Sequence, residues 1–256
     1  MSLHVEVSGQ GEPLVLLHGW GMHGGIWSEM ALQLAEHYQV YNVDLPGHGA
    51  SAPLPNFTLD KVVEQLVAQF SEPVSILGWS LGGQLALHWA ARKPEQIKKL
   101  VLVTSTPCFA EREDWLFGMT QETLQQFAAD LEQNHAATLR RFLALQVRGS
   151  DGERELLSAL RAKLFSRGEP HLEALRGGLE ILRDADQRST LPGIKQPTLV
   201  IAGERDKLTP PEASYYLAQT MPNARVVEIE GAAHAPFLSH SQLFTEHLNQ
   251  FLHERI

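Results

Sequence analysis

A serine in a glycine-flanked turn is the first residue of this sequence that could do chemistry. Gly78-Trp79-Ser80-Leu81-Gly82 fits the pattern Gly-x-Ser-x-Gly, with an apolar run before it at 74–77 and a helical pattern after it at 81–92. A serine at a sharp turn from strand to helix is exposed for nucleophilic attack, and the helix N-terminus favours the negative charge of acyl transfer. We therefore expect Ser80 to be a nucleophile, the alternative being an ordinary Gly/Ser turn.

A nucleophilic serine on this type of turn needs an acid and then a histidine, in that chain order. His234 follows the last predicted strand on the loop before the final helix, which singles it out among twelve histidines. Asp206 directly follows the predicted strand 198–202, at the carboxyl end where active-site loops gather. We expect His234 to be the base and Asp206 the acid that orients it, with Glu204 the nearest alternative.

A second backbone loop could stabilise the negative charge on the substrate. His18-Gly19-Trp20-Gly21 follows the first buried run, 14–17. An oxyanion hole needs the N–H just after the nucleophile and another from a loop on this side of the sheet, so we expect the N–H groups of Leu81 and Trp20. The Trp20 indole either packs or walls an acyl pocket. His18 is expected to bond the loop backbone rather than to titrate.

Metal and cofactor sites are not indicated. Asp44-Leu45-Pro46-Gly47-His48-Gly49 is better explained as a tight, hydrogen-bonded turn after a strand than as a ligand set. No His, Cys and Asp residues have metal-site spacing, and the glycines fit neither the dinucleotide-binding nor the P-loop template. We expect no metal and no organic cofactor.

Alternating strand and helix patterns must hold these residues in place. The predicted strands are 3–7, 14–17, 40–45, 74–77, 100–104, 198–202 and 225–229. The helices between and after them are 27–37, 59–70, 81–92, 211–219 and 241–253. This alternation predicts an α/β protein with a mostly parallel central sheet and helices on both faces. Together with the Ser80 turn and the order of Ser80, Asp206 and His234, this arrangement resembles the α/β-hydrolase fold.

The middle of the chain carries helical patterns only. These are 123–132, 138–146, 153–165 and 172–182. An all-helical segment between two α/β halves should lie above the sheet. We therefore expect a core of residues 1–109 and 189–256, and a helical cap of residues 110–188.

Composition limits the possible partners. The chain has 256 residues, 43% hydrophobic and 20% charged, with a net charge of −9, which argues against a surface that grips nucleic acid or an anionic membrane. The single cysteine, Cys108, excludes an intramolecular disulfide. The start of the chain lacks the features of a leader, and no run approaches the roughly 20 apolar residues of a membrane span. We expect a cytoplasmic monomer without a membrane or nucleic-acid partner.

The predicted cap is locally basic although the chain is acidic. Between residues 137 and 169, seven basic residues stand against four acidic ones, a local balance of +3. The basic residues are Arg140, Arg141, Arg148, Arg154, Arg161, Lys163 and Arg167. They either form a solvated helical face or dock an acidic partner above the active-site entrance.

Taken together, these residues resemble the pimeloyl-[acyl-carrier protein] methyl ester esterases of biotin synthesis, over nearly the whole chain. The similar segments are His18-Gly19-Trp20-Gly21, Gly78-Trp79-Ser80-Leu81-Gly82-Gly83, Arg141-Phe142-Leu143-Ala144-Leu145-Gln146, Gly177-Gly178-Leu179-Glu180-Ile181-Leu182 and Ala232-Ala233-His234-Ala235-Pro236-Phe237. The segments in the cap discriminate best, because caps differ greatly between subfamilies. The resemblance implies a serine carboxylesterase that frees the pimeloyl carboxylate and methanol.

The resemblance also implies which residues meet the substrate. The acyl chain and ester would contact Trp20, Ser80, Leu81, Phe142, Leu143, Ala144, Leu145, Gln146 and His234. The acidic carrier protein would meet Arg141 and Arg154, with Arg140 and Arg161 near by, although alanine or serine stands at other arginine positions of the family. Three alternatives remain open: a generic short-chain carboxylesterase, a carbon–carbon bond hydrolase of the same fold, and a non-catalytic ligand-binding module.

Overall fold

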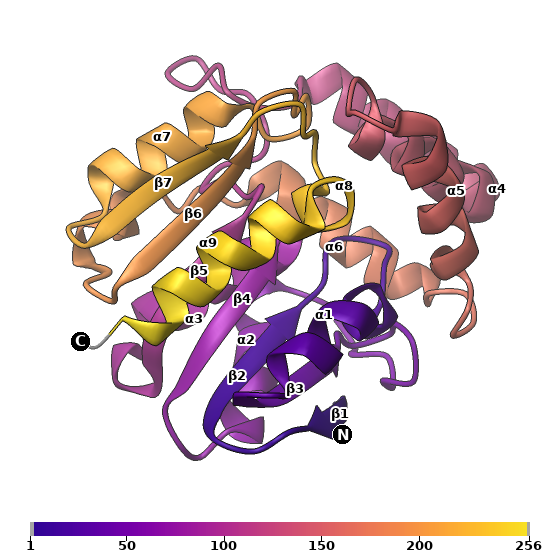
Figure 1. The fold of residues 1–256 in the computed structure, drawn as a ribbon. Helices are drawn as coiled ribbons and strands as arrows, with labels where there is room; N and C mark the ends of the chain where they lie inside the picture. The colour runs from indigo at the N-terminus through magenta and orange to yellow at the C-terminus, as the bar shows by residue number, and fades with distance from the viewer. Residues whose placement is uncertain (1–2, 255–256) are drawn as a thin grey trace.

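A seven-stranded sheet forms the centre of the computed structural model, which describes residues 3–254 (Figure 1). The strands are β1 (His4–Ser8), β2 (Glu12–Leu17), β3 (Tyr38–Asp44), β4 (Val74–Trp79), β5 (Ile97–Val103), β6 (Thr198–Gly203) and β7 (Ala224–Ile229). They are ordered β1-β3-β2-β4-β5-β6-β7, and only the β1–β3 pair is antiparallel. The mostly parallel sheet predicted from the sequence is confirmed.

Helices cover both faces of this sheet, which is why its central strands are apolar runs rather than alternating ones. The helices outside the middle segment are α1 (Ser28–Leu34), α2 (Leu59–Gln69), α3 (Leu81–Arg92), α7 (Pro211–Thr220), α8 (Pro236–Ser239) and α9 (Ser241–His253). Figure 1 shows α1 and α9 in front of the sheet and α2 and α3 behind it. Strand β4 is buried at every residue, so the chain that leads into Ser80 is held rigidly.

The segment between β5 and β6, residues 104–197, contributes three α-helices, a short 3-10 helix (Arg188–Gly193) and no strand of the sheet in the described structure; we call it the helical insertion. Its α-helices are α4 (Gln121–Val147), α5 (Glu153–Leu164) and α6 (Leu172–Asp184). Figure 1 shows α4 and α5 side by side at the upper right, with α6 running below them toward the sheet. Within residues 3–254, no helix is both long and apolar enough to cross a membrane.

Helix α4 is bent so sharply that it forms two arms. Asn134 has non-helical φ and ψ angles of −158° and 85°, and its side-chain oxygen accepts the Ala137 N–H (3.0 Å), as an N-cap does. The rings of Phe127 and Phe142 lie 5.8 Å apart, whereas a straight helix would separate residues at this spacing by about 22 Å. The two helices predicted at 123–132 and 138–146 therefore correspond to the two arms of α4.

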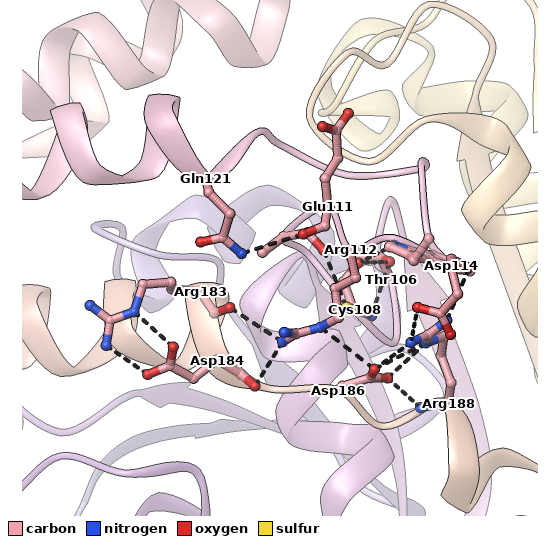
Figure 2. Close-up of polar contacts among 12 residues, drawn as sticks. Thr106, Cys108, Glu111, Arg112, Asp114, Gln121, Arg183, Asp184, Asp186 and Arg188 are labelled. Atoms are coloured by element: carbon pink, nitrogen blue, oxygen red, sulfur yellow. Dashed lines mark hydrogen bonds and ion pairs between the residues drawn. The ribbon is translucent and has the colours of Figure 1, made fainter.

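The two ends of the helical insertion are joined by an ionic network (Figure 2). Arg188 donates to Asp186 (2.6 Å) and to both carboxylate oxygens of Asp114 (3.0 and 3.1 Å). Arg112 donates to the Asp184 carbonyl (3.0 Å) and to the sulfur of Cys108 (3.3 Å). These contacts join the outgoing chain of the insertion to its returning chain.

Candidate active site

Ser80 lies at the turn between β4 and α3 in a strained backbone conformation. Its φ of 54° and ψ of −116° are unusual for a residue with a side chain. The close packing explains the flanking glycines: a Cβ on Gly78 would lie 2.5 Å from the Gly82 carbonyl oxygen, and one on Gly82 would lie 2.5 Å from that of Leu17. The predicted strand–turn–helix context is therefore present. Ser80 itself is 6% exposed.

His234 and Asp206 form a buried pair. His234 Nδ1 lies 2.7 Å from Asp206 Oδ2, and both side chains are essentially inaccessible to solvent. The same carboxylate accepts hydrogen bonds from Thr209 Oγ1 (2.7 Å) and from the N–H groups of Leu208 (2.8 Å) and Thr209 (3.1 Å). Since these donors hold both carboxylate oxygens, Asp206 can only accept from Nδ1–H. The second ring nitrogen, Nε2, is then free to accept a proton.

Hydrogen bonds from three segments hold His234 beside the turn that carries Ser80. The His234 carbonyl accepts hydrogen bonds from the Trp79 indole (2.7 Å) and from Thr104 Oγ1 (2.8 Å), and its N–H donates to the Gln146 carbonyl (3.0 Å). Trp79 immediately precedes Ser80, so the bond from its indole ties His234 to the Ser80 turn. Within the described residues, His234 Nε2 is buried and has no hydrogen-bond partner. A buried, unpartnered nitrogen is expected where a base awaits a proton.

The first loop of the sequence packs directly on Ser80. A Cβ on Gly19 would lie 3.3 Å from Ser80 Cβ, which places the Trp20 backbone next to the serine. In residues 3–254, neither the Trp20 N–H nor the Leu81 N–H donates to another protein group, the latter because it belongs to the first turn of α3. Two free N–H donors near Ser80 are what an oxyanion hole requires.

The Trp20 side chain joins this loop to the helical insertion. Its indole N–H donates to the Leu175 carbonyl (2.9 Å), and its ring meets Phe142 edge-on at 4.9 Å and 84°. A Cβ on Gly178 would lie 2.6 Å from Trp20 Cδ1. Helix α6 can therefore approach the indole this closely only because residue 178 has no side chain. Trp20 thus forms a wall between the serine turn and the helices α4 and α6.

The run from Phe142 to Gln146 lies on the second arm of α4. Phe142, Leu143 and Gln146 are buried, while Ala144 and Leu145 are half-buried. The structure brings two members to the site: Phe142 through Trp20, and Gln146 through its carbonyl bond to His234. The side-chain oxygen of Gln146 is buried and has no partner in the described part of the chain.

The four arginines expected to meet a partner differ in their surroundings. Arg141 forms an ion pair with Asp130 and lies over the Phe127 ring at 4.7 Å, so its charge is partly neutralised. Arg140 lies over Phe165 at 5.3 Å. Arg154 and Arg161 are exposed on α5, and no ion pair to either occurs between residues 3 and 254.

The remaining histidines of the first loops are structural. His18 Nδ1–H donates to the Gly19 carbonyl (2.9 Å) and Nε2 accepts the Leu45 N–H (2.9 Å), which confirms the expected backbone role. Burial holds the pKa of His18 well below its usual value, with His48 adding to the effect. Burial likewise lowers the pKa of His48 to about 4.

The turn that starts at Asp44 is also explained by backbone bonding. The Asp44 carboxylate accepts the N–H groups of Gly24 (2.7 Å) and Ala50 (2.9 Å), as expected of a hydrogen-bonded turn. Glu204, the alternative acid, accepts the Gly231 N–H (2.8 Å) and does not bond to His234. Among residues 3–254, no group of three or more His, Cys, Asp or Glu residues could hold a metal ion.

Sequence reasoning missed the groups that support the acid and the base. These are Thr209, Trp79 and Thr104 by their side chains and Gln146 by its carbonyl. Only Thr209 left a signal, a hydroxyl residue three positions after the acid in a tight turn. The others come from distant segments, so no local pattern could reveal them.

Comparison with known proteins agrees with this geometry. Residues 12–241 match the family described as the alpha/beta hydrolase fold. The pimeloyl-[acyl-carrier protein] methyl ester esterase of Chromobacterium violaceum is 44% identical over 252 residues, covering 98% of both chains. That of Nitrosomonas europaea is 43% identical over 244 residues, covering 95% of this chain and 96% of its own.

Solved structures show the same fold at lower identity. An esterase from Exiguobacterium antarcticum superposes with a TM-score of 0.89 at 25% identity, covering 98% of this chain and 96% of that one. A bromoperoxidase from Bacillus anthracis superposes with a TM-score of 0.88 at 24% identity, covering 98% and 95%, and supports the fold alone. The chain therefore belongs to the α/β hydrolases and, within them, to the family of pimeloyl-[acyl-carrier protein] methyl ester esterases.

Proposed function

We propose that this protein is a serine carboxylesterase that hydrolyses the methyl ester of pimeloyl-acyl-carrier protein to pimeloyl-acyl-carrier protein and methanol in biotin synthesis. The relatives that carry this name in two bacteria support the substrate. One observation carries the chemistry: a buried His234–Asp206 pair, at 2.7 Å, has a free ring nitrogen and is tied by the Trp79 indole to the strained turn of Ser80.

In the first step, Ser80 Oγ attacks the carbonyl carbon of the methyl ester as His234 Nε2 takes its proton. The negative charge on the carbonyl oxygen is held by the N–H groups of Trp20 and Leu81. Asp206 stabilises the imidazolium that forms, because its carboxylate bonds to Nδ1–H. His234 then gives its proton to the departing methoxide oxygen, and methanol leaves an acyl-enzyme on Ser80.

In the second step, His234 takes a proton from a water molecule, whose oxygen attacks the acyl-enzyme carbonyl. The same two N–H groups hold the second oxyanion. Its collapse returns the proton to Ser80 Oγ and releases the free carboxylic acid at the distal end of the pimeloyl chain. The thioester to the carrier remains intact throughout.

Residues 110–188 act in this proposal as a cap over a core of residues 1–109 and 189–256. The apolar wall of Trp20 and Phe142, together with the run up to Gln146, receives the acyl chain. The basic face of the cap meets the acidic carrier protein, and Arg154 and Arg161 are its most available charges. We propose a cytoplasmic monomer as the acting form.

The test compares the pimeloyl-carrier-protein methyl ester with a small p-nitrophenyl ester as substrates. Ser80→Ala should abolish turnover of both. Arg154→Glu/Arg161→Glu should lower kcat/KM for the carrier-bound ester about tenfold or more and leave the small ester unchanged. Arg141→Glu is less informative, because it would also place a second acid beside Asp130. Turnover of the small ester alone by the unmodified enzyme would retain the esterase and remove the carrier-bound substrate.

A further inference from the structure

A wide cleft opens beside the catalytic pair, on the side where the two arms of α4 end. Its volume is about 840 Å³, and it lies between the start of α4, the end of α4 and the loop that carries Asp206. Apolar side chains of Met119, Leu145 and Leu208 contribute to its lining. It is therefore large enough for an extended, partly apolar chain.

The cleft adjoins the reacting groups through its lining residues. The Leu208 N–H donates to Asp206 Oδ1 (2.8 Å), so this residue is part of the loop that holds the acid. Leu145 immediately precedes Gln146, whose carbonyl accepts the His234 N–H (3.0 Å). Since Ser80 and His234 are 6% and 1% exposed, a substrate has to reach them through an opening in the surrounding surface. The cleft borders the residues that hold Asp206 and His234, which makes it a candidate for that opening.

Two positive charges that have no ion-pair partner in the described structure lie at the rim of this cleft. The cations along it are Arg148, Arg205 and Lys207, and the one acid is Glu204. Arg205 forms an ion pair with Asp151 (2.8 Å) and lies 3.5 Å from Glu204. The charges of Arg205 and Glu204 at the rim are therefore neutralised. Within residues 3–254, no ion pair engages Arg148 or Lys207, and both are exposed.

Arg148 and Lys207 are suited to bind an anionic group of the substrate. The protein as a whole carries a net charge of −9, so most of its surface repels anions. The exposed side chains of Arg148 and Lys207 form a local site that attracts them. An acyl-carrier protein presents its acyl group on an arm that has a phosphodiester at one end, amide links along its length and a thioester at the other. Arginine and lysine are the side chains that bind phosphate best.

We propose that the cleft lined by Met119, Leu145 and Leu208 is the entry channel for the substrate's thioester arm, and that Arg148 and Lys207 bind the phosphate of that arm. The inference rests on the proposed function, since it requires a carrier-bound substrate. It assigns to Arg148 and Lys207 a role separate from that of Arg154 and Arg161, which face the carrier protein itself.

The experiment uses four substrates with the same pimeloyl methyl ester: on the carrier protein, on free phosphopantetheine, on pantetheine without the phosphate, and as a simple ester. Arg148→Glu/Lys207→Glu should lower kcat/KM about ten- to hundredfold for the two phosphate-bearing substrates and leave the other two unchanged. Added salt should reduce the difference between the enzymes by screening. Lys93→Glu/Lys195→Glu is the matched control, with the same charge change at the opposite end of the sheet.

The other possible outcomes distinguish failure of the phosphate role from failure of the proposed function. An equal loss on all four substrates, or none on any, would overturn the phosphate role. A loss confined to the carrier-bound substrate would also overturn it, because the two cations would then contact protein. If the unmodified enzyme turns over only the simple ester, the proposed function itself has failed. Unchanged turnover of the simple ester by Arg148→Glu/Lys207→Glu shows that this variant is folded.

Discussion

At the scale of single residues, the site is defined by which groups can donate and which can only accept. Three protein donors and His234 surround the Asp206 carboxylate, so it is held in one orientation and keeps the imidazole in one tautomer. Glu204, two residues earlier in the chain, instead holds the Gly231 N–H at the surface. The two acids therefore have different hydrogen-bond partners despite their proximity.

We predict that Asp206→Asn lowers kcat for a small ester by about three to four orders of magnitude. The amide nitrogen would donate where the carboxylate accepts, which turns the imidazole toward the wrong tautomer. Glu204→Gln is the control, because it retains a side-chain oxygen for the Gly231 N–H, and its kcat should stay within about twofold. Similar losses in both variants would mean that the acid has been assigned wrongly.

The three residues that we propose as catalytic were chosen from chain order and position, and the structure places them as those positions imply. Ser80 follows a strand and precedes a helix, while Asp206 and His234 each follow a strand on the same edge of the sheet. The contacts that complete the site could not be predicted, even where the residue itself had been named. Gln146 contributes a backbone carbonyl from the end of a helix, and Trp79 contributes an indole bond across 155 positions. Such contacts exist only once the elements have packed.

At the scale of elements, the site depends on how closely α6 and α4 approach the first loop. Gly178 allows α6 to touch the Trp20 indole, and Phe142 meets the same indole from α4. The sequence predicted these helices but not the contacts between them. The 3.6-residue periodicity of apolar residues shows which face of a helix is buried, but it does not show which neighbouring element covers that face. The short helix α8 was also missed, because four residues carry no periodic signal.

We predict that Gly178→Ala lowers kcat/KM for esters about tenfold or more. Its Cβ would lie 2.6 Å from Trp20 Cδ1, so the indole, and with it the adjacent N–H donor, must shift. Overpacking of this kind costs about 1–3 kcal/mol. Gly193→Ala is the matched control, since nothing lies within 4 Å of a Cβ there. Unchanged kinetics for Gly178→Ala, with both proteins folded by thermal unfolding, would show that the indole position does not govern the reaction.

At the scale of the whole molecule, buried neutral histidines make stability depend on pH. The rings of His18 and His48 lie 5.2 Å apart beneath the first loops, and burial lowers the pKa of both, that of His48 to about 4. In the unfolded chain both would titrate near the ordinary value of about 6.5. Between those values the unfolded chain binds more protons than the folded protein. The free energy of unfolding must therefore fall as the pH falls from about 6.5 to about 4, and the contribution of His48 levels off below that window.

We predict that His48→Asn removes part of this pH dependence. In the native protein, His48 alone should account for about 2 kcal/mol of the stability lost between pH 7 and pH 5. Asparagine can still donate to the Pro46 carbonyl, as His48 Nδ1 does at 3.0 Å, but it does not titrate. Urea unfolding of both proteins at pH 7, 6 and 5 measures the effect: the variant starts less stable at pH 7, because its side chain fills less volume, and loses less on acidification. Parallel losses in the two proteins would show that His48 is protonated in the folded state, and the loop beneath Trp20 would then be more open to water than its burial indicates.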